Sequence, residues 1–410
     1  MELYLLGNGF DLYHRLPTKY NNFLHTVEFL LKYYDESMDT IGKVFGDSRL
    51  QEQDGWIKLC YETHKSYFDA IWLDSQIILG LVEKAKDNLW FSYLLKSYNR
   101  DLGWIDFEKE VSKVIDAFRS FFNQYEYAKG IDAKYTLDKI HVSHQYIIKQ
   151  FPFFIRWKEA TNSFSFSGHH VVKKYIVETP LHSGYFELNT ELIAKELFDA
   201  LMELGSLLRE YLKYFIEQTA SILLCAGFID YSPFSSNADS SVITFNYTNV
   251  YEKLCKPQCD TCHIHGSLDS RIVLGINPTV EDDVNSIDTT FLRFKKYYQR
   301  IVDRLDDDYL ETITHVNGLY ENGFYIHLTV FGHSLDKTDE DIIKECFNAS
   351  TEITVYYYEP DFHATIRNLI AIFGKDEFDQ LRRKKSLTFK PQPTVDWEEY
   401  KSVQLQIPTL

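Results

Sequence analysis

Residues 2–12 read ELYLLGNGFDL, a short apolar run followed by two glycines on either side of one asparagine. The run from Glu2 to Leu6 predicts a buried strand, and Gly7-Asn8-Gly9 predicts the turn that ends it. A strand of this length is not stable alone, so we expect it to join a sheet formed by later segments. Glycines at such a turn let the backbone approach a pyrophosphate, and a helix that begins there favours negative charge. A simple tight turn is an equally good interpretation of the two glycines taken alone.

The segments after Ser241 alternate between strand and helix patterns. The expected strands cover 242–245, 262–265, 271–276, 325–331 and 352–358, and the expected helices cover 336–347 and 361–373. Strands that alternate with helices favour parallel pairing and a layered α/β fold. We therefore predict a Rossmann-like parallel sheet that includes the N-terminal strand.

The long segment before Ser241 is mainly helical in pattern. Apolar residues recur every three to five positions from Leu192 to Phe215, after a capping sequence at 189–191. Residues 107–122 show the same spacing, and we interpret their aromatic rings as core. Residues 161–184 are mixed in polarity and predict an irregular connection. The resulting domains are an α/β domain (1–20 plus 238–375), a mainly helical insertion (21–237) and a loose C-terminal tail (376–410).

The composition excludes several classes of protein. The chain has 410 residues, with 43 Lys and Arg against 60 Asp and Glu, a formal charge of −17. This charge argues against a protein that coats duplex nucleic acid, because that role needs a basic face, but it permits one small nucleotide. The 45% apolar content argues against disorder, and no apolar run reaches the roughly 18 residues of a membrane span. Six sparse cysteines and no visible secretory signal predict a soluble cytoplasmic protein without a disulfide framework.

Three later motifs end predicted strands in polar or glycine-bearing turns. They are 245–248 (FNYT), 263–269 (HIHGSLD) and 330–336 (VFGHSLD). Ligands bind at the carboxyl ends of the strands in an open α/β sheet, so we expect these turns and the first glycine turn to surround one crevice. Asn246 could fix a ribose hydroxyl or orient a water, and His265 could act as a base near neutral pH. An ordinary turn role stays open for Asn246, and a helix cap by Ser334 or Asp336 stays open for the motif at 330–336. Asp11 follows the glycines too closely to be the ribose-binding acid of a dehydrogenase, which lies about 20 residues further on.

In combination these motifs resemble the AbiH family of bacterial abortive-infection proteins, which act in defence against phage. The resemblance rests on segments 7–12 (GNGFDL), 16–20 (LPTKY), 245–248, 264–266 (IHG) and 331–335 (FGHSL), with Asp339 after them. Trp104, Asp106 and Glu108 also fit a Trp-x-Asp-x-Glu element associated with the family. Arg15 departs from the pattern, because the family usually has Gly at that place. The resemblance implies a role in phage defence.

The motifs are also similar to those of the sirtuin-like nicotinamide-dinucleotide fold. Gly7, Gly9 and Pro17 fall in step with the sirtuin opening without a gap. An Asn, a His-Gly and a Gly-x-Ser element follow in the sirtuin order, at 246, 265–266 and 332–334.

Three departures limit what the sirtuin similarity implies. Thr18, Tyr20 and Phe245 stand where sirtuins have Asp, Arg and Gln. The similarity therefore implies the fold and a nucleotide pocket more than deacylase activity. Sirtuin-like domains of bacterial defence systems instead hydrolyse NAD, and their Asn and His are taken to be catalytic.

By this resemblance, we expect hydrolysis of NAD at the nicotinamide–ribose bond. The bond breaks through an oxocarbenium-like state and needs a positioned water. Asn246 would hold that water or a ribose hydroxyl, His265 would accept a proton, and Asp11 would stabilise the developing positive charge. The residues expected to bind the dinucleotide are Gly7, Asn8, Gly9, Phe10, Pro17, Thr18, Tyr247, Gly266, Gly332, His333, Ser334 and Asp339.

Other interpretations stay open. One is a nucleotide-sensing module that does not turn its ligand over. Another is a metal-dependent nuclease, in which Asp106, Glu108 and Glu110 on one helix would hold Mg²⁺. No metal is expected, although Cys255, Cys259 and Cys262 have spacing suited to structural zinc. The expected partner is a small nucleotide, with no membrane and no bulk nucleic acid, and a homo-oligomer and a phage-derived trigger are left open.

Overall fold

A computed structural model describes most of the chain. The described residues are 1–97, 104–127, 141–156, 163–166, 169–178, 186–223, 228–234, 240–255, 261–276, 289–384 and 387–404. The chain forms two compact units. Unit 1 comprises Met1–Val82, Ser206–Val273 and Arg300–Leu410, and unit 2 comprises Glu83–Gly205 and Leu274–Gln299. Unit 1 thus contains the first part of the predicted insertion, residues 21–82, together with the C-terminal segment.

Unit 1 contains a six-stranded sheet in which every neighbouring pair is parallel. Its strands are β1 (Glu2–Leu6), β7 (Ser240–Thr244), β8 (Thr261–His263), β9 (His327–Phe331), β10 (Glu352–Tyr357) and β11 (Thr388–Pro391). They are arranged β11-β10-β9-β1-β7-β8, and Leu3 of β1 pairs with Ser241 on one side and Leu328 on the other. Numbered along the chain, this order is 3-2-1-4-5-6 when read from β8, which is the order of dinucleotide-binding Rossmann folds. The predicted fold class is confirmed.

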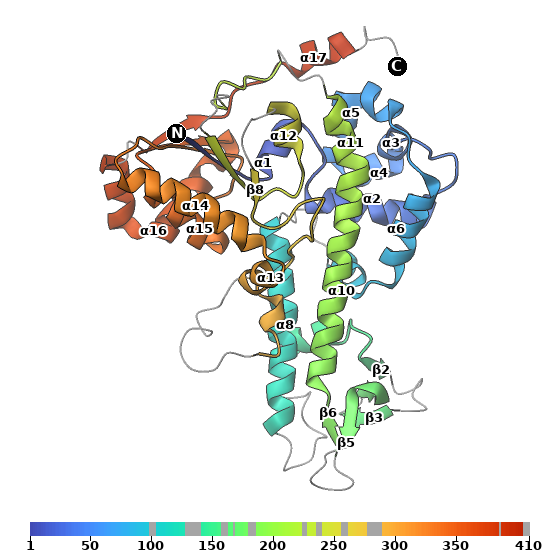
Figure 1. Cartoon of the computed structure of the whole chain (residues 1–410). Helices are drawn as coiled ribbons and strands as arrows, with labels where there is room; N and C mark the ends of the chain where they lie inside the picture. Colours follow the sequence, from blue (N-terminus) through green and yellow to red (C-terminus); the bar gives the residue numbers. More distant parts are fainter. Residues whose placement is uncertain are drawn as a thin grey trace. The chain divides into compact units, whose positions relative to one another are not determined.

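Helices cover both faces of this sheet. Alternate residues of β1 point to opposite faces, so Leu3 and Leu5 enter one buried apolar cluster while Tyr4 packs on the other side. The first face is covered by α14 (Leu305–Glu321), α15 (Glu340–Asn348) and α16 (Phe362–Lys384), which lie together in Figure 1. On the second face, Tyr4 and Phe10 both contact Tyr251 of α12 (Val250–Cys255). The N-terminal strand is therefore a central strand of a three-layered domain.

Helices dominate the predicted insertion. Within unit 1 they are α2 (Tyr20–Tyr33), α3 (Ile41–Phe45), α4 (Ser48–Gln53), α5 (Gly55–Ala70) and α11 (Gln218–Ile222). Unit 2 holds α7 (Leu89–Ser97), α8 (Trp104–Tyr127) and α9 (Val142–Ile148). Three helices have residues in both units, namely α6 (Ser75–Asp87), α10 (Thr190–Tyr211) and α13 (Lys296–Val302). The chain also passes from unit 1 to unit 2 between Val273 and Leu274. The Asn189 side chain accepts a hydrogen bond from the Leu192 N–H at 3.0 Å, which confirms the cap predicted for α10. Phe107, Val111 and Phe118 of α8 are buried, which confirms the core interpretation of this helix.

Unit 2 also contains short strands. They are β2 (Phe154–Arg156), β3 (Ser163–Phe166), β4 (His169–Val172), β5 (Ile176–Glu178) and β6 (Phe186–Leu188), all in antiparallel pairs. Residues 161–184 were expected to be irregular, and three of these strands fall within that range. Strands of three or four residues carry too few alternations to produce a clear pattern.

Two other expectations about secondary structure were wrong. Residues 271–276 form no strand beyond an isolated bridge at Ile276, because their backbone bonds elsewhere: the Val273 N–H donates to His265 O at 2.9 Å. The C-terminal segment is not loose over 388–404, since β11 pairs with β10 and α17 (Trp397–Gln404) follows it. β11 is an edge strand with mostly exposed side chains, so it carries little apolar pattern.

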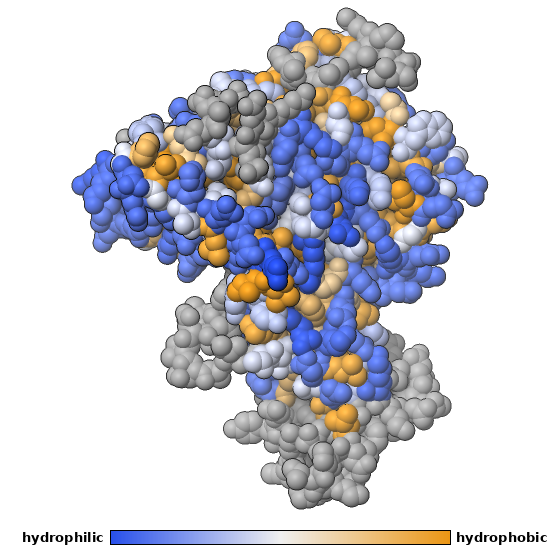
Figure 2. All heavy atoms as spheres, in the orientation of Figure 1, coloured by the Kyte–Doolittle hydropathy of each residue, from blue (hydrophilic) through white to orange (hydrophobic). Residues whose placement is uncertain are grey.

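On the face drawn in Figure 2, many of the described side chains are hydrophilic, in keeping with the charge of −17. Apolar side chains are exposed at separate places, among them Trp72, which is 72% exposed. No helix among the described residues is long and apolar enough to cross a membrane.

Candidate functional site

The order of the strands reverses between β1 and β9, and this is the point where open α/β sheets bind their ligands. The turns that follow these two strands pack directly against each other. The Gly7 N–H donates to Phe331 O at 3.1 Å, and the Gly9 N–H donates to Gly332 O at 2.8 Å. A Cβ atom on Gly7 or Gly9 would lie 2.6 Å from backbone atoms of the facing turn. The glycines thus permit the two turns to touch, and these two N–H groups already have partners within the protein.

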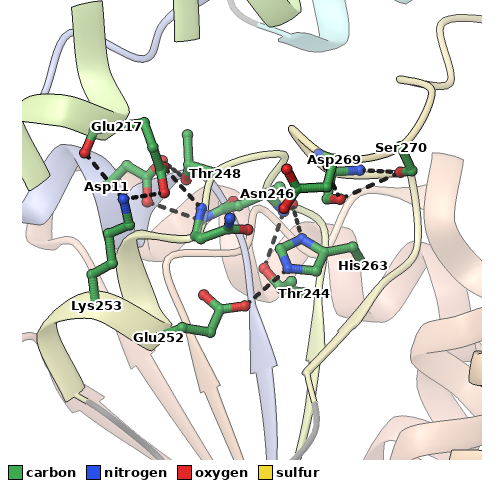
Figure 3. Close-up of polar contacts among 12 residues, drawn as sticks. Asp11, Glu217, Thr244, Asn246, Thr248, Glu252, Lys253, His263, Asp269 and Ser270 are labelled. Carbon is green, nitrogen blue, oxygen red and sulfur yellow. Dashed lines mark hydrogen bonds and ion pairs between the residues drawn. The ribbon is translucent and has the colours of Figure 1, made fainter. Parts of the chain in front are cut away.

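Asp11 lies just beyond this contact, on the short helix α1 (Gly9–Tyr13), and is only 1% exposed. Its carboxylate accepts one hydrogen bond from Thr248 Oγ1 at 2.6 Å and another from Asn246 Nδ2 at 3.1 Å (Figure 3). Burial raises the pKa of Asp11 from 3.8 to about 7. The charges of Glu217 and Glu252 raise this pKa further, whereas the two hydrogen bonds oppose the shift. The structure therefore holds a carboxyl group that titrates near neutral pH at the end of β1.

Asn246 has three polar groups with partners and one without. Its backbone N–H donates to Thr244 Oγ1 at 3.1 Å, and its backbone oxygen lies 2.9 Å from Nδ1 of His263. Its Nδ2 donates to Asp11. Its Oδ1 is buried and has no hydrogen-bond partner among the described residues, although the residue is only 6% exposed. A buried carbonyl oxygen of this kind can accept a hydrogen bond from a water or a hydroxyl group.

His265 and His333 lie on either side of Asp339. The Nε2 atom of each ring is 3.7 Å from an oxygen of the Asp339 carboxylate. The Phe245 ring packs against both histidines, with centroids 4.2 Å from His333 and 5.4 Å from His265. Three residues predicted to lie in the site, His265 from one motif and His333 and Asp339 from another, are thus brought together.

Several residues expected to bind the dinucleotide have structural contacts. Thr18 Oγ1 donates to Asn8 Oδ1 at 2.7 Å, and this bond ties the two ends of the first turn together. The Tyr247 hydroxyl donates to Val273 O at 3.2 Å. Phe10 is fully buried.

The other predicted positions vary in exposure. Pro17 O accepts a hydrogen bond from the Tyr211 hydroxyl at 2.7 Å. Gly266 has a φ of +82°, and a Cβ there would lie 1.9 Å from Arg271 O, so only glycine fits this turn. Ser334 is exposed. The positions predicted as dinucleotide contacts therefore include buried residues with protein partners as well as exposed ones.

The family comparison covers most of the chain. The family model described as bacteriophage abortive infection AbiH matches residues 3–358. The chain belongs to the AbiH family. No curated protein and no solved structure matches it.

The departure of Arg15 from the AbiH pattern has a clear backbone basis. Arg15 has a φ of +54°, in the left-handed region that favours glycine. Its side chain donates to Thr63 Oγ1 at 2.9 Å and lies over the Trp397 ring, 4.7 Å from the centroid. The arginine therefore keeps the backbone conformation typical of the glycine and adds two contacts.

Four residues near Asp11 were not predicted as part of the site. They are Glu217, Thr248, Glu252 and Lys253, all drawn in Figure 3. Thr248 stood within a quoted motif, and its hydroxyl at the end of a strand was the available signal. No sequence signal distinguished the two glutamates or the lysine from the many charged residues of the chain.

The carboxylates of the nuclease alternative have other partners. Glu108 pairs with Lys296, while Glu110 pairs with Lys113 and accepts a hydrogen bond from the Tyr93 hydroxyl at 3.0 Å. The side chain of Asp106 lies outside the described residues.

The described residues contain no cluster of side chains that could bind zinc. Cys255 and Cys262 are free thiols, and Cys259 lies outside the described residues. Within the described part of the chain, no three side chains of His, Cys, Asp or Glu are placed to hold a metal ion.

Proposed function

We propose that this AbiH-family protein defends bacteria against phage by hydrolysing NAD at the nicotinamide–ribose bond. The observation that carries the proposal is the buried pair of Asp11 and Asn246 at the ends of β1 and β7. One member is a carboxyl group with a pKa of about 7, and the other has a buried side-chain oxygen that accepts no hydrogen bond from the described residues. The Rossmann-like strand order and family membership support a nucleotide substrate and a defensive role.

The proposed reaction needs few groups. Water attacks C1′ of the ribose as the C–N bond breaks, and the bonding electrons stay with the nicotinamide nitrogen, which leaves neutral. Asn246 Oδ1 orients the water or a ribose hydroxyl, and ionised Asp11 stabilises the positive charge that develops on the ribose. His265, which faces Asp339 at 3.7 Å, accepts the proton that the water loses.

The test uses infected cells, so that any trigger supplied by the phage is present. Bacteria that express the chain or its Asn246→Ala variant are infected, and their NAD and free nicotinamide are measured over time. We expect NAD to fall and nicotinamide to rise with the unmodified chain, and neither change with Asn246→Ala. Asn322→Ala is the matched control, because Asn322 is an exposed residue at the end of α14.

The result that would overturn the proposal is specific. If the unmodified chain protects the culture from phage while NAD stays constant, the site does not act on NAD. The purified protein mixed with NAD gives a second measurement, because nicotinamide released there needs no cellular enzyme.

A further inference from the structure

The long helix that leads toward the site contains an irregular turn. Leu212–Glu217 is π-helical and lies between α10, which ends at Tyr211, and α11, which begins at Gln218. A π-helical turn bonds each N–H one residue further back than an α-helix does, so the side chains after it are rotated about the axis. Glu217 ends the turn and is only 9% exposed. The irregular turn thus coincides with a carboxylate that points into the protein, and such turns are frequent at functional sites.

Glu217 is bound to α12, the helix that follows the Asn246 motif. Its Oε1 lies 2.5 Å from Lys253 Nζ, and its Oε2 accepts a hydrogen bond from the Asn249 N–H at 3.3 Å. Lys253 also donates to Ser221 Oγ at 2.7 Å and lies 3.4 Å from the backbone oxygen of Glu217. The ion pair is therefore fixed at both ends by further hydrogen bonds.

This ion pair lies next to Asp11. Figure 3 shows the side chains of Glu217, Lys253 and Asp11 close together. The negative charge of Glu217 opposes ionisation of Asp11, after the larger effect of burial. Glu252 acts in the same direction, and its Oε1 lies 2.9 Å from Nε2 of His263. Thr248 and Asn246 donate to Asp11 and favour ionisation.

From these contacts we propose that Glu217 and Lys253 form a positioning pair that sets whether Asp11 is protonated at neutral pH. Glu217 favours the protonated form and Lys253 limits that effect, so the two residues act in opposite directions. This pair acts on the carboxyl group that the proposed NAD hydrolysis uses. The inference rests on that proposed function only where enzymatic activity is measured. The protonation of Asp11 itself can be measured without any substrate.

The test is a double-mutant cycle of Glu217→Gln, Lys253→Met and the double variant. The Asp11 carboxyl is titrated by ¹³C NMR of protein labelled at aspartate, and Asp11→Asn identifies its signal. Glu217→Gln removes a negative charge, so we expect the midpoint to fall by about one pH unit. Lys253→Met leaves Glu217 without its cation, so we expect a rise of similar size. The double variant should return close to the unmodified protein.

The control is Glu311→Gln, since Glu311 is an exposed residue of α14. Circular dichroism checks that each variant is folded. If Glu217→Gln does not fold, Lys253→Met still tests the predicted rise of the Asp11 titration midpoint. Shifts in the same direction for both single variants, or no shift in folded protein, would overturn the proposal. Opposite shifts without nicotinamide release from any form would support the positioning pair and count against NAD hydrolysis.

Discussion

At the scale of single residues, Asp11 weakens the fold at the pH where the site would work. Burial opposes its charge, and the two donors beside it do not compensate fully, so its pKa in the folded protein is about 7 against an ordinary value of 3.8. Between these two pH values the folded chain binds more protons than the unfolded chain. The free energy of unfolding therefore falls as the pH rises from about 4 to about 7. A residue of this kind is typical of a functional site rather than of core packing.

Asp11→Asn should therefore stabilise the protein, and the gain should depend on pH. The amide has nearly the shape of the carboxyl group but cannot ionise. Each pKa unit corresponds to about 1.36 kcal/mol, so we expect a gain on the order of 4 kcal/mol at pH 8 and almost none at pH 4. Urea unfolding at the two pH values measures it. Asp307→Asn, at an exposed position of α14, should change stability by less than about 0.5 kcal/mol at both. A destabilised Asp11→Asn protein at pH 8 would contradict the assignment.

Arg15 allows a second prediction at this scale. Because its φ is +54°, alanine at this position would keep the strain of the left-handed region, whereas glycine would not. Both substitutions remove the contacts with Thr63 and Trp397. We expect Arg15→Gly to be more stable than Arg15→Ala by about 1 kcal/mol, the reverse of the order usual in helices. The midpoints of urea unfolding of the two variants test this order. An Arg15→Ala variant at least as stable as Arg15→Gly would show that the left-handed backbone at this position costs little.

Part of the site could be predicted from single residues and part could not. Asp11 and Asn246 were predicted together because each follows a recognisable strand at the same edge of the sheet, and the structure joins them by a hydrogen bond of 3.1 Å. Glu217 and Glu252 could not be predicted, because a charged residue in a helix is most often solvated and nothing in the pattern marks an exception. Their proximity to Asp11 arises from tertiary packing.

At the scale of elements, the two turns at the centre of the sheet depend on glycine. Gly332 has a φ of +67°, and a Cβ there would lie 2.2 Å from the Phe10 N atom. We expect Gly332→Ala to destabilise the protein by at least about 3 kcal/mol, since it adds backbone strain and forces α1 away from β9. Gly318→Ala in α14 should instead stabilise by up to about 1 kcal/mol, because nothing lies within 4 Å of its added Cβ. The midpoints of thermal unfolding of the two variants test this difference. Equal shifts of the two midpoints would contradict the special role of Gly332.

The elements that were predicted correctly share strong patterning. β1, β7, β9 and β10 lie inside the sheet, and each contains at least three consecutive buried residues. β11 lies at the edge of the sheet and ends in Pro391, which made the segment look like a terminus. The π-helical turn at Leu212–Glu217 was missed for a different reason. Its buried residues continue the spacing of α10, and the shift of one residue does not interrupt that pattern.

At the scale of the whole molecule, two buried histidines join segments that are far apart in the sequence. The His14 ring lies 2.7 Å from Phe10 O through Nδ1 and 2.9 Å from the Tyr231 hydroxyl through Nε2. The His64 ring lies 2.8 Å from His14 O and 3.1 Å from the hydroxyl of Tyr400 in α17. Each neutral ring donates one hydrogen bond and accepts one, so a second proton would remove an acceptor. Burial lowers the pKa of His14 to about 4 and that of His64 to about 3.

These histidines and Asp11 have opposite effects on stability in acid. Below their ordinary pKa of 6.5 the histidines bind protons in the unfolded chain but not in the folded one, so the free energy of unfolding falls as the pH falls. Asp11 binds its proton more readily in the folded chain, so over the same range it raises the free energy of unfolding. From pH 7 to pH 5 we expect the two histidines to lower the free energy of unfolding by about 4 kcal/mol and Asp11 to restore about 2 kcal/mol, because Asp11 is still about half protonated in the folded protein at pH 7. The unmodified protein should thus lose only about 1 to 2 kcal/mol over that interval, and Asp11→Asn should lose about 4 kcal/mol. Urea unfolding at pH 7 and pH 5 measures both losses, and equal losses in the two proteins would show that Asp11 does not offset the histidines.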